Sequence, residues 1–436
     1  MQVIENKSEG GFVVLARAFC GALSVVLSAC MAAVACWTVE IERPPDAEDW
    51  GVGDTAGTPA LPPEPEEVVK KDIYVTGVKY RDGYDWHADS DYGHALCTLF
   101  LMRGTERILS LPVGAEHLMS PDADMHRCFG GHLYTDFSTD HETVIKKDGV
   151  ELFRYQAREM ICGFHVEKGE VHTLGMARDG SGWTYRKNGV VVLGGDAGHL
   201  KTGFGTDGRV LWFAYAEYGN AVLSQDEGAV AKAGGGRYFV VRNGVPEEIR
   251  LQRNVSSVDD LVLHGGEVSY VACLGGAGAH AVFTGASSAF LELGGMSQTK
   301  DCRFRCGEDS PMQVSGLRYG VSGTACATVW TDCAVTFEYP DAEICWCGVE
   351  DGQLNMVLKD ISEAEPRLVI VDGAAAVDYG REHEYSFLSE AGACADAGRL
   401  YVALYPKEQG THPAMMYDGV FTEYDFNGYF TSVTAW

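Results

Sequence analysis

Short runs of β-branched, aromatic and other apolar residues recur along this chain, and each run ends at a tight-turn residue. Most of these turns are Asn-Gly or Asp-Gly, the pairs favoured where a two-residue hairpin turn needs positive φ. The hairpins repeat about every 45 residues, as expected of one supersecondary unit used repeatedly. The eight hairpins start with TLFLMRG (98–104), ETVIKKDG (142–149), GWTYRKNG (182–189), RYFVVRNG (237–244), AHAVFTG (279–285), CATVWTDC (326–333), PRLVIVDG (366–373) and PAMMYDG (413–419).

A second series of turns precedes the first and defines the unit. Each of these turns is followed by another apolar run, so a unit reads strand A, turn, strand B, variable loop, strand C, turn and strand D. Four such strands make an antiparallel propeller blade. The turn residues of this second series are Gly131, Gly169, Gly208, Gly266, Ser310, Gly352 and Gly398.

The two series differ by one member, and the difference predicts how the ring closes. The repeat region opens at IYVTG (73–77), which is a strand B, and YFTSVTAW (429–436) can supply the missing strand A. Closure of this kind removes an open sheet edge. We therefore predict an all-β fold, an eight-bladed β-propeller of four-stranded antiparallel blades over residues 72–436. One wide interval leaves seven blades possible, and a β-sandwich or two small all-β domains are the alternatives.

The blade repeat resembles that of lipid-anchored β-propeller proteins of Bacteroidetes, in which a "vYvaG" strand is followed by a "WkNG" hairpin. The matching segments here are IYVTG, EVHTLG and SYVAC, with YRKNG and VVRNG at the hairpins. Tryptophan is absent before most of the turns, so the match is loose. The resemblance implies a fold and an extracytoplasmic compartment rather than an activity.

The N-terminal region predicts export. The apolar run from Ala18 to Trp37 resembles the h-region of a signal peptide, and Leu27-Ser28-Ala29-Cys30 fits a bacterial lipobox. We expect a signal peptide over residues 1–29, lipidation at Cys30 and an acidic, Pro-rich tether over residues 30–71. A signal anchor and a second, poorer lipobox ending at Cys36 are the alternatives. Each of them places the propeller outside the cytoplasm, and the lipobox predicts attachment to the outer membrane, on its periplasmic side or at the cell surface.

Charge and the absence of catalytic signatures limit the function classes. The net charge of −28 disfavours nucleic acid as a partner, because an acidic surface repels a phosphate backbone. The sequence has no HExxH, GxSxG or Walker loop. Eleven cysteines follow the tether, and those in the strands are expected to act as small apolar residues, with Cys345 and Cys347 facing the same side. At least one disulfide remains possible, whereas we expect no metal, no cofactor and no catalytic residue.

Candidate ligand-binding residues come from the loops, because propellers bind ligands through connections at one end of a rigid ring. The longest B–C loops are those of blade one (78–94) and blade four (216–236), whereas the glycine turns of the other face are too short to form a cavity. Aromatic and acidic side chains interleave in the first loop, as suits sugar rings or peptide side chains. The alternative is that Trp86 plugs the channel mouth while the acids are solvated. The candidate ligand contacts are Tyr84, Trp86, His87, Asp89, Asp91, Trp183 and Tyr218.

Two function classes follow from these residues. We favour a monomeric, non-catalytic recognition or scaffolding module of the cell envelope that binds a glycan or protein partner at the cell surface through its loop face. The alternative is a polysaccharide hydrolase or lyase, with Asp89, Asp91 or Asp179 as acid and base across the channel mouth.

Overall fold

The computed structural model describes residues 71–436 with short gaps, and these residues belong to the compact unit Glu67–Trp436. The gaps are 89–96, 114–125, 139–140, 158, 178–181, 196–198, 207–209, 218–236, 253–254, 265, 276–278, 286, 294–297, 306–311, 321–322, 351 and 374. No helix within the described residues is long and apolar enough to cross a membrane.

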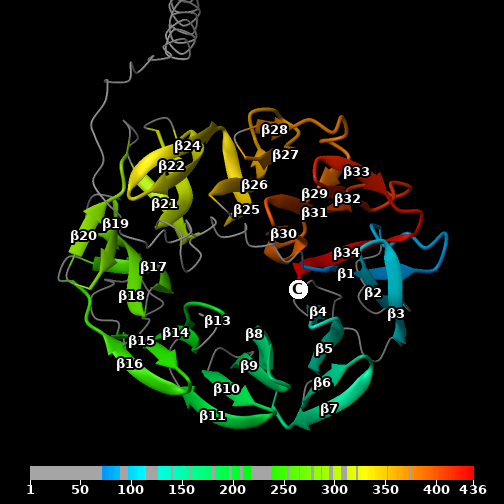
Figure 1. The fold of residues 1–436 in the computed structure, drawn as a ribbon, viewed down its shortest axis with the longest axis horizontal. Helices are drawn as coiled ribbons and strands as arrows, with labels where there is room; N and C mark the ends of the chain where they lie inside the picture. Colours follow the sequence, from blue (N-terminus) through cyan, green and yellow to red (C-terminus); the bar gives the residue numbers. More distant parts are fainter. Residues whose placement is uncertain are drawn as a thin grey trace, which may run out of the picture. The chain divides into compact units, whose positions relative to one another are not determined.

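The strands in the described residues form eight antiparallel sheets arranged in a ring, so the fold is the predicted eight-bladed β-propeller (Figure 1). Blade one contains β34 (Gly428–Ala435), β1 (Ile73–Tyr80), β2 (Cys97–Arg103) and β3 (Glu106–Val113). Blade two contains β4 (His126–Phe129), β5 (His132–Ser138), β6 (Thr143–Lys147) and β7 (Val150–Tyr155). Blade three contains β8 (Glu159–Glu167), β9 (Glu170–Ala177), β10 (Trp183–Lys187) and β11 (Val190–Gly195). Blade four contains β12 (His199–Leu200), β13 (Gly205–Thr206), β14 (Leu211–Glu217), β15 (Arg237–Arg242) and β16 (Val245–Ile249).

Blades five to eight repeat this order along the chain. Blade five contains β17 (Val255–His264), β18 (Glu267–Leu274), β19 (His280–Thr284) and β20 (Ser287–Phe290). Blade six contains β21 (Gln298–Phe304), β22 (Gln313–Tyr319), β23 (Ala325–Thr331) and β24 (Ala334–Pro340). Blade seven contains β25 (Ala342–Glu350), β26 (Gln353–Asp360), β27 (Arg367–Asp372) and β28 (Ala375–Val377). Blade eight contains β29 (Tyr385–Ser386), the 3-10 turn η4 (Glu390–Gly392), β30 (Ala393–Asp396), β31 (Arg399–Pro406), β32 (Ala414–Tyr417) and β33 (Val420–Glu423).

Strand A is split into two short pieces in blades four and eight. In blade four, β12 and β13 both pair with β14, and in blade eight β29 and β30 both pair with β31. The wide interval between the third and fourth hairpins therefore contains an irregular blade rather than a missing one.

The ring closes by the predicted pairing of the last strand with the first. β34 lies antiparallel to β1, from Ile73 opposite Ala435 to Lys79 opposite Gly428. A buried cluster of hydroxyls strengthens this junction, because Thr76 Oγ1 lies 2.7 Å from Thr431 Oγ1 and 2.6 Å from Ser432 Oγ. Residues at the two ends of the sequence thus complete one sheet and leave β1 without a free edge.

The tight turns have the backbone that their sequences predict. Asp148, Asn188, Asn243 and Asp418 all have positive φ, and a glycine with positive φ follows each of them. Blade six uses Asp332 and Cys333 instead, with φ of 50° and 67°. A cysteine thus occupies the left-handed position that glycine fills in those four hairpins, at some cost in backbone strain.

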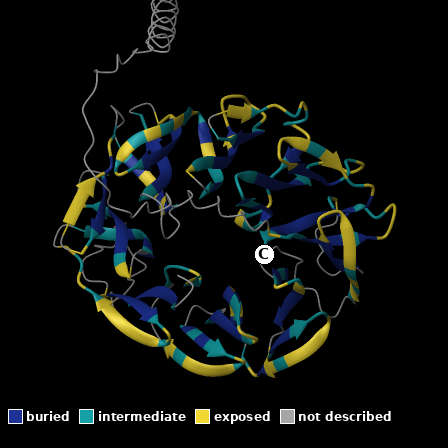
Figure 2. Ribbon diagram, viewed as in Figure 1, coloured by how far each residue is buried: buried dark blue, intermediate teal, exposed yellow. Residues whose placement is uncertain are grey.

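Buried apolar side chains gather between blades rather than within them. Within the described residues they form eight clusters, and each cluster draws on two neighbouring blades. Successive side chains of a strand point to opposite faces, so β14 contributes Phe213 and Tyr215 to one junction and Trp212 and Ala214 to the next. The B and C strands are therefore apolar on both faces, while the outermost strands are largely exposed (Figure 2).

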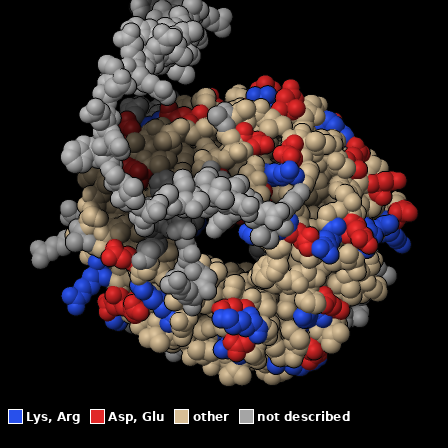
Figure 3. Space-filling view, in the orientation of Figure 1, with Lys and Arg blue, Asp and Glu red and all other residues tan. Residues whose placement is uncertain are grey.

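Charged side chains lie around the periphery of the ring, with acidic and basic groups next to one another on the face shown in Figure 3. Several form exposed ion pairs, such as Arg154 with Glu142 and Arg237 with Glu248. Exposed pairs contribute little to stability, so apolar packing at the junctions is the main source of stability.

One buried histidine makes the stability of the ring depend on pH. His126 of β4 is 2% exposed, and burial first, with Arg127 second, lowers its pKa from 6.5 to about 3. Unfolding restores the ordinary pKa of His126. The unfolded chain therefore binds a proton at pH values where His126 stays neutral in the folded chain. Stability is therefore fully present above the unfolded pKa and falls as pH drops from there toward about 3.

We predict that His126→Gln reduces this acid sensitivity. Between about pH 7 and pH 5 the wild type should lose on the order of 1 kcal/mol more per pH unit than the variant, as measured by chemical denaturation. Part of the slope should remain, because burial also lowers the pKa values of His165 and His172. The exposed His383→Gln should behave like the wild type. Equal slopes for all three proteins would contradict this assignment.

Candidate functional site

The aromatic loop after β1 packs against the ring closure. Trp86, a predicted ligand contact, is 3% exposed and lies in the apolar cluster shared by blades one and two. Its ring centroid lies 5.0 Å from that of Tyr429 in β34 and 5.4 Å from that of Tyr405 in blade eight. Its Nε1 donates a hydrogen bond to Asn427 Oδ1 at 3.0 Å. The Trp86 ring is thus enclosed by aromatic neighbours and packs within the protein.

Hydrogen bonds tie this loop, residues 81–88, to the end of the chain, and we call it the latch. Asn427, just before β34, donates from Nδ2 to the carbonyl oxygens of Arg81 and Tyr84, both at 2.8 Å. His87 stacks on Trp86 at 3.6 Å, and its Nε2 donates to the Pro406 carbonyl at 2.9 Å. The latch therefore contacts the residue just before β34 in blade one, and it also joins blade one to blade eight.

The other predicted contacts do not gather with the latch. Trp183 of β10 is 3% exposed and packs two blades away, with its ring centroid 4.5 Å from that of Tyr215. Tyr84 is half-buried in the latch. Of the seven candidates the structure thus brings together Tyr84, Trp86 and His87. The remaining candidates, Asp89, Asp91 and Tyr218, lie outside the described residues, as does Asp179.

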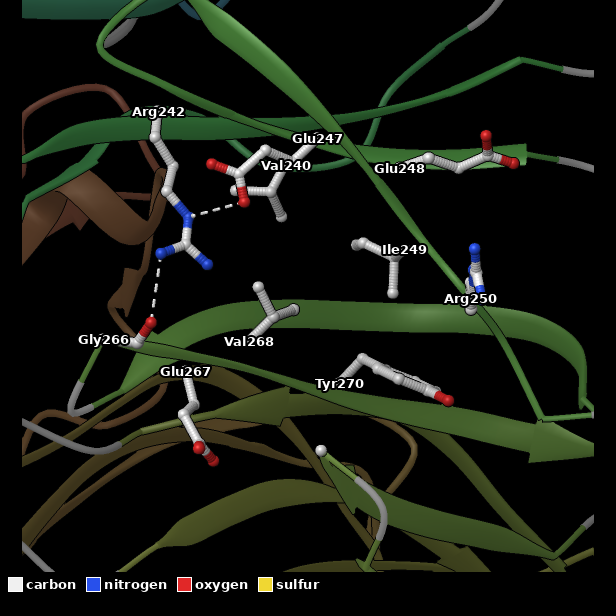
Figure 4. A pocket seen from close by; sticks show the side chains of 11 residues that line it. Val240, Arg242, Glu247, Glu248, Ile249, Arg250, Gly266, Glu267, Val268 and Tyr270 are labelled. Carbon is white, nitrogen blue, oxygen red and sulfur yellow. Dashed lines mark hydrogen bonds and ion pairs between the residues drawn. The ribbon is translucent and has the colours of Figure 1, made fainter.

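A groove lies at the junction of blades four and five, next to the glycine turns (Figure 4). Its volume is about 390 Å³, within the range of small-ligand pockets. Val240 of β15, Ile249 of β16, and Val268 and Tyr270 of β18 form an apolar lining. The sequence had predicted no cavity on this side, because its turns are short. The groove arises between strands of two blades, so turn length does not limit it.

The contacts between successive blades differ around the ring. At the first three junctions a side chain of the outermost strand lies against the turn glycine of the next blade: Leu111 near Gly149, Phe153 near Gly189, and Val192 near Gly244. At the junction of blades four and five no described atom of blade four lies within 4 Å of the Cβ position of Gly285, the first residue of its turn, and Gly373, Gly419 and Gly104 later in the ring likewise have no described neighbour from the preceding blade. Strand β16 carries Glu247 and Glu248 there, and carboxylates keep to water rather than fill an apolar junction.

Charged side chains border the groove, and some of them are paired with other residues while others are not. Arg242 donates from Nη1 to the Gly266 carbonyl at 3.1 Å, and its Nε lies 3.5 Å from Glu247 Oε2. Glu248 pairs with Arg237 outside the groove. Glu267, at the turn end of β18, and Arg250, just past the far end of β16, are exposed and form no hydrogen bond or ion pair with the described residues. A carboxylate and a guanidinium without a direct partner thus lie at opposite ends of an apolar floor, although the charge of Arg250 also acts on Glu248.

Sequence reasoning missed this groove, although a signal for it was present. The outermost strands of blades two and three read VELFRY and VVVLGG, whereas β16 reads VPEEI. The adjacent acids Glu247 and Glu248 set β16 apart from these two strands and lie beside the groove.

The described cysteines do not provide a nucleophile at either location. All ten are free thiols, and burial raises the pKa of Cys97 to about 12 and that of Cys345 and Cys347 to about 11. A raised pKa disfavours the reactive thiolate. The prediction that Cys345 and Cys347 face the same side is wrong. A β-bulge between Ile344 and Trp346 shifts the alternation, so the two thiols pack into different junctions.

Comparisons with known proteins identify no family for this chain. No known family model and no curated protein matches it. Solved structures with a similar fold include the acylaminoacyl peptidase of Pyrococcus horikoshii (12% identity, TM-score 0.42, covering 70% of this chain and 53% of the peptidase). Another is the β-propeller domain of the Trilobed protease from Pyrococcus furiosus (9% identity, TM-score 0.41, covering 69% of this chain and 95% of that domain). A third is a eukaryotic initiation factor (8% identity, TM-score 0.43, covering 83% of this chain and 99% of that chain). This chain spans about half the length of the peptidase, and similarities this low assign no function to it.

We predict that the latch is needed for stability. Trp86→Ala should lower the free energy of unfolding by about 3–5 kcal/mol, because it leaves a cavity among aromatic rings. Asn427→Ala should cost about 1–3 kcal/mol, since two backbone carbonyls and the Trp86 indole lose their partner. Both are measured by chemical denaturation, with the exposed Phe290→Ala as a control that should change little. A Trp86→Ala protein as stable as the control would show that the ring is not a packing residue.

Proposed function

We propose that this protein is a non-catalytic recognition module that binds a segment of a partner protein in the groove between blades four and five. The observation that carries this proposal is the apolar floor with an exposed carboxylate, Glu267, at one end and an exposed guanidinium, Arg250, at the other, neither of them in an ion pair with the described residues. Such a site combines an apolar surface with a negative charge at one end and a positive charge at the other. Specific protein interfaces are usually built in this way.

The lining favours a protein segment over a sugar. Sugar rings commonly stack on exposed aromatic faces. The aromatic side chain in the groove is Tyr270, which is 4% exposed and stacked on Phe283, with ring centroids 4.8 Å apart. No aromatic face is therefore presented along the described lining. Ile249 and Val268, which are partly exposed, instead offer an aliphatic surface that suits an apolar side chain.

The charges specify the order of residues in the partner. An apolar side chain would occupy the floor, a Lys or Arg would pair with Glu267, and an Asp or Glu would pair with Arg250. A volume of about 390 Å³ lies near the lower end of the range for ligand sites, so the groove suits one or two anchoring side chains. The acidic net charge of −28 attracts basic partners from a distance.

The groove is held by a rigid scaffold. Its two walls come from neighbouring blades that share the largest buried junction cluster, which includes Trp212, Val240, Leu261 and Tyr270. Because both walls are strands, the charged ends are held at a fixed spacing, and a pre-organised site loses less entropy on binding.

Sequence features support a location at the cell envelope. The lipobox ending at Cys30 and the acidic tether over residues 30–71 would hold the propeller at the outer membrane, where a partner at the cell surface is available. The hydrolase or lyase alternative depends on Asp89, Asp91 and Asp179, which lie outside the described residues. No observation on the described residues favours it.

A charge-swap experiment tests the groove. Peptides selected from a displayed random library on the wild-type protein should carry an apolar residue between a basic and an acidic one. Glu267→Lys should weaken their binding about tenfold, which corresponds to about 1.4 kcal/mol. The double variant Glu267→Arg, Arg250→Glu should select peptides with the two charges in reverse order.

A matched control uses the outermost strand of blade one. Glu106→Lys changes an exposed acid to a base there, and it should leave affinity for the selected peptides unchanged. Equal losses of peptide affinity in Glu106→Lys and Glu267→Lys would show that the effect comes from net charge rather than from the groove. Peptides that bind the wild type and the double variant Glu267→Arg, Arg250→Glu equally well would refute the proposed site.

The anchor is tested separately. Cys30→Ser should leave an unprocessed precursor and abolish incorporation of labelled palmitate, whereas Cys36→Ser should do neither. The opposite result would move the anchor to Cys36, and no effect of either change would favour a signal anchor. Peptide binding by the propeller is independent of this result.

A further inference from the structure

Three side chains with metal-ligating atoms meet at the junction of blades five and six. They are Asp259 of β17, His280 at the start of β19 and Cys302 of β21. One ligand atom from each residue lies within 4.8 Å of the other two, and no other group of three such side chains meets this criterion among the described residues. The cluster lies in a different junction from the groove.

The histidine is held in one orientation by both of its ring nitrogens. Nε2 lies 2.8 Å from Asp259 Oδ2, and Nδ1 lies 2.7 Å from the hydroxyl of Thr299. The His280 side chain is 4% exposed and Cys302 is fully buried, whereas the Asp259 side chain is 20% exposed. The cluster is thus enclosed by protein and reaches solvent on the side of Asp259.

Two β-bulges place the acid and the thiol. In β17, Val258 and Asp260 are opposite consecutive residues of β18, so Asp259 is an extra residue. In β21 the register shifts between Lys300 and Arg303, so the segment that contains Cys302 also bulges. A bulge redirects a side chain that would otherwise follow the alternation of the strand. Bulges on adjacent inner strands therefore direct these two side chains toward the same histidine.

Neighbouring residues fix both bulges. Asp260 accepts a hydrogen bond from the backbone N–H of Phe304 at 2.9 Å, which ties β17 of blade five to β21 of blade six. Gly316 of β22 leaves room for the thiol, since a Cβ at this position would lie 3.0 Å from Cys302 Sγ.

A cysteine nucleophile activated by a His-Asp pair does not fit this arrangement. Such a relay needs one ring nitrogen on the thiol and the other on the carboxylate. Here Nε2 of His280 contacts Asp259, and Nδ1 contacts Thr299. The thiol is also fully buried, so no substrate could reach it.

We propose that Asp259, His280 and Cys302 bind a divalent transition-metal ion of the zinc class, which clamps blade five to blade six. Zinc accepts nitrogen, oxygen and sulfur ligands together, at bond lengths of about 2.0–2.3 Å. The three ligand atoms lie close enough together to surround one ion after small side-chain rotations. Thr299 supplies the outer hydrogen bond that ligating histidines usually make, and this leaves Nε2 as the ligating nitrogen.

The site has three protein ligands, so a water molecule would complete a tetrahedral ion on the side of Asp259. Because the ligands come from two blades, metal binding would strengthen the contact between those blades. Binding free energy of this kind adds directly to folding stability. The metal is therefore assigned a structural role that is independent of any ligand in the groove.

Cobalt substitution tests the site on the full-length protein. After removal of metal with a chelator, Co²⁺ should bind at one equivalent and produce a thiolate-to-cobalt charge-transfer band in the near ultraviolet. Cys302→Ser should abolish this band, while Asp259→Asn and His280→Gln should weaken Co²⁺ and Zn²⁺ binding at least tenfold. Cys326→Ser removes another buried thiol of blade six and should leave the band intact.

Two further measurements keep the proposal falsifiable if a ligand variant folds poorly. Thr299→Val should retain the band but lower metal affinity about 10–100-fold, because it removes only the outer hydrogen bond. Added Zn²⁺ should raise the Tm of the chelator-treated wild type and not that of Asp259→Asn. Absence of a charge-transfer band in the wild type, or an unchanged band in Cys302→Ser, would overturn the proposal.

Discussion

The two apolar faces of each blade are the constraint on which this structure depends. A four-stranded sheet whose middle strands are apolar on both sides cannot be stable alone in water, and each blade must be covered by two neighbours. A ring satisfies this requirement for every blade, provided that it closes. The pairing of β34 with β1 closes it, and the hydroxyl cluster around Thr76 reinforces that pairing. The latch extends the same closure, because Asn427 joins the loop after β1 to the residues just before β34.

Repetition makes local departures from the common pattern informative. At three successive junctions an apolar side chain of one blade lies against a turn glycine of the next, whereas Gly285, Gly373 and Gly419 have no such contact among the described residues. The junction of blades four and five is distinguished by the acids of β16, and the groove lies beside them. Bulged inner strands are another recurring feature, and Cys162, Cys302 and Cys345 all lie at such bulges. Of these, Cys302 meets a histidine and a carboxylate from the neighbouring blade.

The strands, turns and closure were predictable because they depend on local chemistry. Asn-Gly and Asp-Gly pairs specify positive φ, and alternating apolar runs specify strands, so the order of strands within a blade followed from their spacing. The roles of Trp86 and Trp183 did not follow in this way. An aromatic residue in a loop has the same local sequence whether it faces solvent or packs inward. The burial of Trp86 depends on Asn427, Tyr405 and Tyr429, which are more than 300 residues distant in sequence.

The sequence alone determined the repeat, the fold class and the strand that closes the ring, because each depends on patterns within about 45 residues or on the count of strands. Tertiary structure decided where the chain has a groove, which aromatic rings are buried and which ligating side chains meet. These features arise between blades, where residues from distant repeats come within a few ångströms of each other. A β-bulge shifts which face a side chain occupies, as at Cys345 and Asp259, and no local pattern in the sequence records that shift.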